Sequence, residues 1–482
     1  MTAETRNLLI LMSDEHQARA LGCAGHPFAQ TPNLDRLASR GLCFTNAYTP
    51  SPICVPARAS FATGLWTHQT RLWDNAMPYT GAIRGWGHVL QEAGIPVESI
   101  GKLHYRDQED HAGFDREHIP MMVVDGVGMV WGSIRNPPMF RDPKGRMLGD
   151  YIGAGESNYT KYDRAVTRRT LDWLRERAER DDGQPWCLYV GLVAPHFPLV
   201  VPQEFMDLYP LDQLPPVKLH PSTGYEPHPW AKIQADFMDT EGKFRDEEER
   251  LTAIAAYYGL CSFLDHNIGK ILQVLEESGQ SERTTVIYTS DHGDNVGARG
   301  MWGKSNFYQE STAIPFIISG TEVPTGQCAT PMNLIDCAPT ILEHFGLCDA
   351  EIAACPGKSL YAIAAEPDEL ERITFSEYHA AGSATAGFML RKGRWKYHYY
   401  VGHKPELFDL EDDPEELTDL AGHPEHAATQ AALHQELLKI CDPEDTDAVA
   451  HADQEAMIEG YGGKEKAMKL GAPAATPPPV VS

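Results

Sequence analysis

The sequence predicts an α/β protein in which a large, mostly parallel β-sheet lies between helices and a smaller α+β domain with an antiparallel sheet follows. Three observations support this: short apolar runs that end in polar residues, amphipathic helical stretches between them, and hairpin-spaced runs after about residue 366. Strands buried on both faces have continuous apolar runs, whereas hairpins favour antiparallel pairing. We expect a large domain over 1–365, an antiparallel subdomain over 366–445 and an extended tail over 446–482.

The large domain is expected to contain strands at 7–12, 97–100, 186–193, 285–289 and 314–318 and helices at 31–41, 54–64, 86–94, 162–180, 247–278 and 333–345. Gly, Pro and acidic or hydroxyl residues mark the ends of several of these helices. Two stretches with weak periodicity, 107–159 and 201–243, separate them. Long irregular segments of this kind often form binding loops, so we expect them to supply the walls of a pocket.

The subdomain is expected to hold strands at 373–378, 387–391, 395–400 and 406–409 and a final helix at 426–440. Residues after 446 end in a Pro- and Ala-rich stretch of low complexity, which favours an extended conformation. Such a tail can wrap a neighbouring subunit, so a homo-oligomer is expected. A single monomeric peak in light scattering would contradict that expectation.

The composition limits the choice of partners. The chain of 482 residues has 42% hydrophobic residues and a net charge of −27, which argues against nucleic acid or an anionic membrane as the main partner. A local cationic pocket can still bind a small anion. The ten cysteines show no CxxC pair, so they are expected to be mostly free thiols. The N-terminus lacks the pattern of a signal peptide, which favours a cytoplasmic location.

One cysteine stands at the start of a predicted helix, in the pattern Cys54-Val-Pro-Ala-Arg58. Pro56 suits the first turn, where its missing N–H costs nothing. The helix N-terminus offers free N–H groups, and the guanidinium of Arg58 adds a planar set of donors for an anion. The pattern therefore places a thiol at an oxyanion site, although a cysteine before a helix is more often a small buried hydrophobe.

Ionisable residues follow four of the predicted strands. Because the carboxyl ends of parallel strands share one edge, these side chains are expected to meet in space. Carboxylates there suit a divalent cation, and cations suit a tetrahedral oxyanion. Each residue alone also fits a turn, a rigid loop or a solvated surface. The set that we expect around Cys54 is Asp14, Glu15, Arg58, Lys102, His104, His196, Asp291, His292 and Lys304.

These stretches resemble the formylglycine-dependent sulfatase family of the alkaline phosphatase-like superfamily. The similarity extends over most of residues 7–420 in family order and is closest in texture to choline sulfatase and other bacterial sulfatases, with phosphonate monoester hydrolases next. The matching segments are Asn7–Asp14, Thr31–Asp35, Cys54–Ser60 with Gly64, Gly101–His104, Pro195-His196, Tyr288–Gly293, Gly300–Lys304 and Leu407–Leu410.

The resemblance implies an alkaline phosphatase-like catalytic domain and oxidation of Cys54 to formylglycine (3-oxoalanine) by a formylglycine-generating enzyme. One hydroxyl of the hydrated aldehyde would attack sulfur, and loss of a proton from the second would expel sulfate and restore the aldehyde. This chemistry explains why cysteine, rather than serine, is encoded.

The same resemblance assigns a role to each matching residue. Asp14, Asp291, His292 and residue 54 would bind the metal, with Glu15 a doubtful further ligand. Arg58 would fix the aldehyde hydrate, and Lys102 and Lys304 would hold sulfate oxygens. His104 would be the base that triggers ester collapse, and His196, with Lys304, the acid for the leaving oxygen. Asn75 is a weaker candidate for a polar contact.

Three interpretations follow from these residues. The first is a sulfatase for small organic or aryl sulfate esters. The second uses the same site on phosphonate monoesters or phosphodiesters; it gains support from His292, because imidazole favours transition metals, which leaves Ca²⁺ and Mn²⁺ both open. The third is a metal-binding scaffold with an unmodified thiol. Turnover of aryl sulfate against aryl phosphonate separates the first two, and mass spectrometry of the Cys54 peptide tests the third.

Overall fold

A computed structural model describes residues 6–141, 144–180, 182–472 and 475–480. Its centre is an eight-stranded sheet in the order β11-β2-β10-β9-β1-β7-β4-β5. The strands are β1 (Asn7–Asp14), β2 (Leu42–Phe44), β4 (Val97–Lys102), β5 (Arg116–Met121), β7 (Cys187–Pro195), β9 (Thr284–Ser290), β10 (Phe316–Ser319) and β11 (Gly326–Cys328). Strands β9, β1, β7 and β4 pair in parallel, and β10 runs antiparallel to both of its neighbours. The predicted mostly parallel sheet is confirmed.

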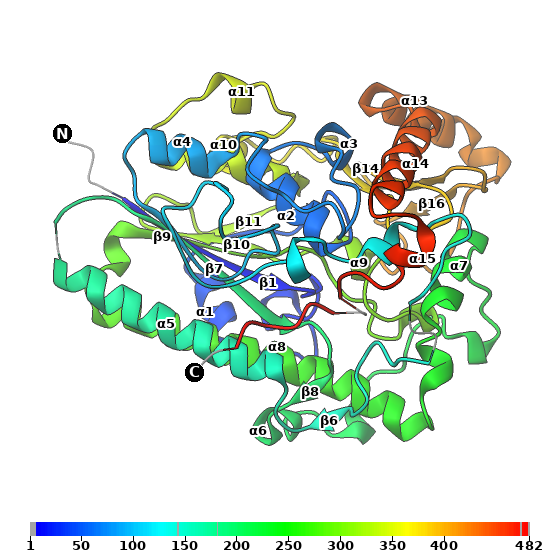
Figure 1. Ribbon diagram of the computed structural model, residues 1–482, viewed down its shortest axis with the longest axis horizontal. Helices are drawn as coiled ribbons and strands as arrows, with labels where there is room; N and C mark the ends of the chain where they lie inside the picture. The colour runs from blue at the N-terminus through cyan, green and yellow to red at the C-terminus, as the bar shows by residue number, and fades with distance from the viewer. Residues whose placement is uncertain (1–5, 142–143, 181, 473–474, 481–482) are drawn as a thin grey trace.

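Helices cover both faces of this sheet (Figure 1). One face packs against α1 (Pro32–Ser39), α5 (Asn158–Arg180) and α8 (Glu247–Glu277), and the other against α2 (Cys54–Thr63), α4 (Trp86–Glu92) and α10 (Cys337–His344). Alternate β1 side chains enter the two cores: Leu9 and Leu11 on one face, Leu8 and Ile10 on the other. Burial of each of these side chains stabilises the fold by about 1.5–3 kcal/mol. Because both faces of β1 are buried, its sequence is a continuous apolar run.

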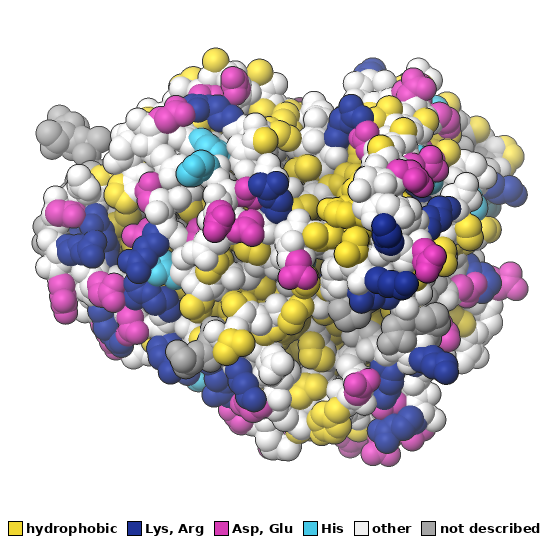
Figure 2. Space-filling model, in the orientation of Figure 1, with side chains coloured by type: hydrophobic (Ala, Val, Ile, Leu, Met, Phe, Trp, Pro, Cys, Tyr) yellow, Lys and Arg dark blue, Asp and Glu magenta, His cyan; other side chains and the backbone are white. Residues whose placement is uncertain are grey.

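A second sheet follows in the chain. It is antiparallel, with strands β13 (Thr374–Tyr378), β14 (Gly387–Lys392), β15 (Trp395–Tyr400) and β16 (Glu406–Asp409) in that order. Helix α13 (Ala427–Ile440) packs on it through Leu433 and Leu437. The predicted second, antiparallel unit is confirmed. Figure 2 shows apolar side chains in the hollow between the part that carries α4 and the part that carries α13.

Shorter elements complete the described chain. They are β3 (Ala47–Tyr48), α3 (Thr67–Thr70), β6 (Gly153–Ala154), β8 (Val200–Val201), α6 (Gln203–Met206), α7 (Pro229–Met238), α9 (Gln309–Thr312), β12 (Met332–Asn333), α11 (Ala350–Ala353) and α12 (Leu360–Ala364). Among the described residues, no helix is long and apolar enough to cross a membrane.

Two expectations about irregular segments need correction. The stretch 107–159 contains β5, a parallel edge strand beside β4 that its polar sequence hides. The expectation of an extended tail over 446–482 is wrong for its first part, because α14 (Pro443–Gly460) and α15 (Lys464–Ala467) are helical. The Asp442 carboxylate accepts bonds from two N–H groups at the start of α14, and Ile458 packs against a loop of the large domain. Those tertiary contacts decide the helix.

Candidate active site

Cys54 opens α2 at the carboxyl edge of the sheet. Ile53 before it is extended, and Gly64 ends the helix in the left-handed conformation with φ of 75°. The side-chain oxygen of Asn75 accepts a hydrogen bond of 3.1 Å from the Val55 N–H, which satisfies one of the free donors at the helix start. Because all of α2 is buried, the position of Cys54 is held by the surrounding core.

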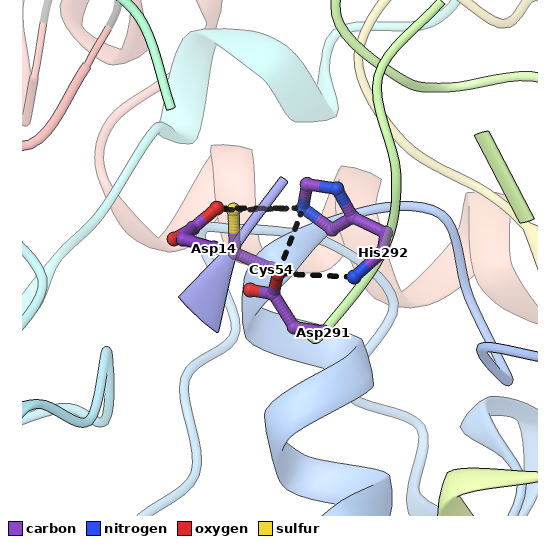
Figure 3. Close-up of side chains that lie close together, drawn as sticks. All are labelled: Asp14, Cys54, Asp291 and His292. Carbon is purple, nitrogen blue, oxygen red and sulfur yellow. Dashed lines mark hydrogen bonds and ion pairs between the residues drawn. The ribbon is translucent and has the colours of Figure 1, made fainter. Parts of the chain in front are cut away.

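Four side chains converge at this point: Asp14 from the end of β1, Cys54, and Asp291 and His292 just after β9 (Figure 3). The Cys54 Sγ lies 3.2 Å from His292 Nε2 and 3.6 Å from Asp14 Oδ1. One donor atom from each residue lies within 4.8 Å of the others, and all four are buried. The predicted convergence of strand ends therefore occurs.

The donor set fits a divalent cation. The Nδ1 of His292 lies 3.0 Å from the carbonyl of Gly293, so Nδ1 donates and the lone pair of the neutral ring lies on Nε2. That atom is 3.7 Å from Asp291 Oδ1 and 3.8 Å from Asp14 Oδ1. Arg58 binds the opposite oxygen of each carboxylate, at 2.9 Å for Asp291 and 3.4 Å for Asp14. A backbone carbonyl that orients a histidine is typical of metal sites.

Two cations lie beside the carboxylates. The Lys102 ammonium pairs with Asp14 Oδ2. Arg58 also donates to the carbonyl of Lys102 at 3.0 Å and to the Tyr189 hydroxyl at 2.8 Å. Burial alone would raise the pKa of Asp14, but Lys102 and Arg58 hold it well below its usual 3.8. Asp14 is therefore anionic at neutral pH, as a metal ligand requires.

Glu15 lies with a second group of side chains rather than among the four converging side chains. Its Oε2 is 3.1 Å from Lys304 Nζ and 3.3 Å from His196 Nε2. Burial raises the pKa of Glu15 well above 4.5. Its backbone has φ of 70°, a conformation that costs a non-glycine residue about 1–3 kcal/mol. Glu15 Oε2 is thus placed to accept a hydrogen bond from Lys304 Nζ, beside the His196 ring.

His196 and Lys304 share one proton. The His196 Nδ1 lies 2.6 Å from the Phe197 carbonyl and donates to it, so Nε2 accepts from Lys304 Nζ at 3.0 Å. Burial lowers the pKa of His196 well below 6.5. Burial would also lower that of Lys304, but the acidic groups around it, Cys54 and Glu15 among them, hold it well above 10.5. The proton of this pair lies on Lys304.

The predicted site residues surround one pocket above Cys54. Asn75, Lys102, His104, His196 and Lys304 all line it. Its volume of about 80 Å³ is room for a handful of water molecules. Arg58 and the carboxylates lie beneath, in contact with one another rather than with the cavity.

Sequence reasoning missed most of the pocket wall. The two irregular stretches do contribute, as expected, through Met129 and Met147 from one and Gln234 and Thr240 from the other. Ala235, also from the second stretch, lines the pocket too. Further lining residues come from other parts of the chain: Ile53, Phe197, Gly300, Met301, Trp302, Gly303, Ser305, Tyr378, Ala381, Ala475 and Thr476. Apart from Gly300–Gly303, which lie in a segment that matches the family, no motif marks these residues, because only the packing of loops brings them together.

The site combines carboxylates and imidazoles at strand ends with a cysteine at a helix N-terminus. Two buried cations, Arg58 and Lys102, and the partly exposed Lys304 complete it. This arrangement suits hydrolysis at a tetrahedral oxyanion. The sulfatase family matches residues 6–347, and the family described as N-sulphoglucosamine sulphohydrolase, C-terminal, matches residues 297–442. The chain belongs to the sulfatase family and is a sulfuric ester hydrolase.

Known proteins agree with this assignment. The chain is 32% identical to a choline-sulfatase of Rhizobium meliloti over 90% of its own length and 86% of that protein. It is 28% identical to arylsulfatase K of Danio rerio over 86% and 80%. A phosphonate monoester hydrolase from Silicibacter pomeroyi has the same fold, with a TM-score of 0.73, 24% identity and coverage of 90% and 94%.

Proposed function

We propose that the protein hydrolyses small organic or aryl sulfate esters, with Cys54 converted to formylglycine and a divalent metal, Ca²⁺ or Mn²⁺, bound by Asp14, Asp291, His292 and residue 54. The observation that carries the proposal is the position of Cys54 among three metal-type donors at a helix N-terminus. Burial raises the pKa of the Cys54 thiol to about 11. Without a metal the encoded thiol is therefore protonated at neutral pH and is a weak nucleophile.

The oxidised, hydrated residue 54 would supply the attacking hydroxyl, and the metal would stabilise negative charge on the sulfate oxygens. Around them, Lys102 and Lys304 bind sulfate oxygens. Lys304, which holds the proton shared with His196, protonates the leaving oxygen, and Glu15 orients Lys304 by accepting a hydrogen bond from it. Arg58 keeps Asp14 and Asp291 in ligand geometry. His104 accepts the proton released when sulfate leaves.

The pocket wall suggests the chemistry of the organic group. Among the described residues no carboxylate lines the cavity, and Met129, Met147, Phe197 and Trp302 supply much of its surface. A compact, neutral or aromatic group fits such a wall. A quaternary ammonium group, like that of choline, would be held by aromatic faces alone. We therefore expect aryl sulfates to be better substrates than choline-O-sulfate.

The second candidate is a phosphonate monoester hydrolase or phosphodiesterase that uses the same site. The observation that favours it is His292, an imidazole donor suited to Mn²⁺, together with the fold shared with a phosphonate monoester hydrolase. Sulfuryl and phosphoryl transfer place charge on similar oxygens, so the site accommodates both. Some promiscuous activity is expected.

The test uses protein co-produced with a formylglycine-generating enzyme, the partner this maturation requires. Mass spectrometry of the Cys54 peptide should show the lighter aldehyde. Turnover of 4-nitrophenyl sulfate should exceed that of an aryl phosphonate monoester in kcat/KM. A strong preference for the phosphonate would transfer the main activity to the second candidate, and full activity with unmodified Cys54 would refute the mechanism. A cytoplasmic location and a homo-oligomer stay predictions.

A further inference from the structure

The C-terminal segment, described over residues 470–472 and 475–480, reaches the active site. It leaves α15 and crosses the front of the molecule toward α5 (Figure 1). Trp131 Nε1 donates to the Ala472 carbonyl at 2.8 Å, and Arg141 donates to the carbonyl of Gly471 at 2.7 Å. Further along, the Tyr159 hydroxyl of α5 donates to the Thr476 carbonyl at 2.5 Å. The segment is thus hydrogen-bonded to Trp131 and Arg141 at one point and to α5 at another.

Thr476 contacts a residue at the centre of the site. Its Oγ1 lies 2.8 Å from Nε2 of His104, and both residues are buried and line the pocket. Within the described residues the other ring nitrogen, Nδ1, is buried and has no hydrogen-bond partner. The His104 backbone has φ of 60°, a strained conformation of the kind found at functional sites. The ring therefore has a single protein hydrogen bond, and Thr476 provides it.

That single contact bears on the chemistry, because a neutral imidazole carries its proton on one nitrogen only. Burial first, and then Lys102, holds the pKa of His104 well below 6.5, so the resting ring is neutral. A proton on Nε2, donated to the threonine hydroxyl, leaves the lone pair on Nδ1. A proton on Nδ1 would instead bury an unpaired N–H, which costs about 1–3 kcal/mol.

We propose that Thr476 is a positioning residue: its hydroxyl accepts a hydrogen bond from Nε2–H of His104 and leaves Nδ1 as the atom that accepts a proton during sulfate release. This inference depends on the base role of His104 in the proposed function. It makes the C-terminal segment a part of the active site. A third group that orients a catalytic base is a recurrent arrangement in enzymes.

The test compares Thr476→Val, which keeps the shape but removes the hydroxyl, with Thr476→Ser, which keeps the hydroxyl. For 4-nitrophenyl sulfate we expect Thr476→Val to lower kcat by about 10- to 100-fold, the usual effect of losing an orienting partner, with KM changed less than about twofold. Thr476→Ser should retain kcat within about twofold. Thr67→Val, a buried threonine in α3 whose hydroxyl has no described partner, controls for the exchange itself.

A second measurement does not need turnover. Histidine labelled with ¹⁵N in the intact chain reports which ring nitrogen carries the proton, and the His104 signal is assigned by its loss in His104→Gln. Wild type and Thr476→Ser should show protonated Nε2 and unprotonated Nδ1, and Thr476→Val should show a mixture.

The two measurements separate the hypotheses. Protonated Nδ1 in the wild type would overturn the inference, as would an unchanged kcat in Thr476→Val. A higher kcat/KM in that variant would mean that the segment obstructs the pocket, which also contradicts it. If the wild type turned over no sulfate ester, the proposed function would fail, while the tautomer measurement would still stand by itself.

Discussion

The floor and the roof of the pocket are built in different ways. The floor consists of strand ends and the start of α2. In its buried interior Arg58 forms ion pairs with Asp14 and Asp291, and the Cys54 thiol donates a hydrogen bond to Asp14. The roof consists of loops, with Met129, Met147, Trp302 and the C-terminal segment as members. The difference suggests that the floor determines which bond is broken and the roof determines which molecules enter.

The largest effect is expected at the floor, from Cys54→Ala. This change removes the atom from which the nucleophile would form, so kcat for aryl sulfate should fall by about 10⁴-fold or more. Because the exchange is small, thermal denaturation should show a folded protein. Ala62→Gly on the same helix is a control for altered packing. Residual activity above about 1% of wild type would place the nucleophile elsewhere.

A smaller loss, about 10²-fold at limiting metal, is expected from His292→Ala. Excess Mn²⁺ should restore part of the activity, because two carboxylate ligands remain. A chelator should lower the melting temperature of wild type more than that of the variant, since a bound ion stabilises only the folded state. His434→Ala, far from the pocket, is the control. Equal sensitivity to the chelator would argue against His292 as a ligand.

A change in the roof should alter which substrates bind well rather than the rate of the chemical step. Met147→Ala enlarges the pocket, so KM for a small aryl sulfate should rise about 3- to 10-fold, while kcat changes little. Met147→Leu, which keeps the volume, should behave like wild type. Michaelis constants for a series of aryl sulfates of increasing size would measure this. A loss confined to kcat would contradict the proposed difference in role between floor and roof.

The smallest effect on activity, with a large effect on stability, is expected at Glu377 of β13. It accepts hydrogen bonds from His68 of α3 at 2.8 Å and from His379 at 2.9 Å. Burial would raise its pKa, but the two histidines lower it to about 2. A lowered pKa stabilises the fold above the unfolded value of 4.5, and the contribution of about 3 kcal/mol is lost as pH falls from 4.5 toward 2.

Glu377→Gln should therefore unfold at lower denaturant concentration at pH 7, with kcat near that of wild type. Its stability should depend less on pH between 4.5 and 2 than that of the parent chain. Denaturant titrations at several pH values would measure both effects. Glu455→Gln, at an exposed carboxylate on α14, is the matched control. An unchanged pH dependence would show that the Glu377 carboxylate does not stabilise the contact between α3 and the antiparallel sheet.

Much of the floor could be predicted from the sequence. Apolar runs predict strands, and the shared edge of parallel strands predicts that Asp14, Lys102 and Asp291 meet. The pairing of side chains and the position of protons within the site were harder to predict. The proton of the His196 and Lys304 pair lies on lysine, and Glu15 joins that pair, because burial and neighbouring charges outweigh residue type.

The sequence by itself determined the parallel sheet, the helix that Cys54 opens and the antiparallel C-terminal unit, because periodicity and turn residues act locally. Only the tertiary structure decided the helix α14, the roof of the pocket and the contact of Thr476 with His104. Each of these features depends on contacts between distant segments. Thr476 and His104, for example, are more than three hundred residues apart along the chain. No local pattern records such contacts, since their free energy arises when distant segments leave water together.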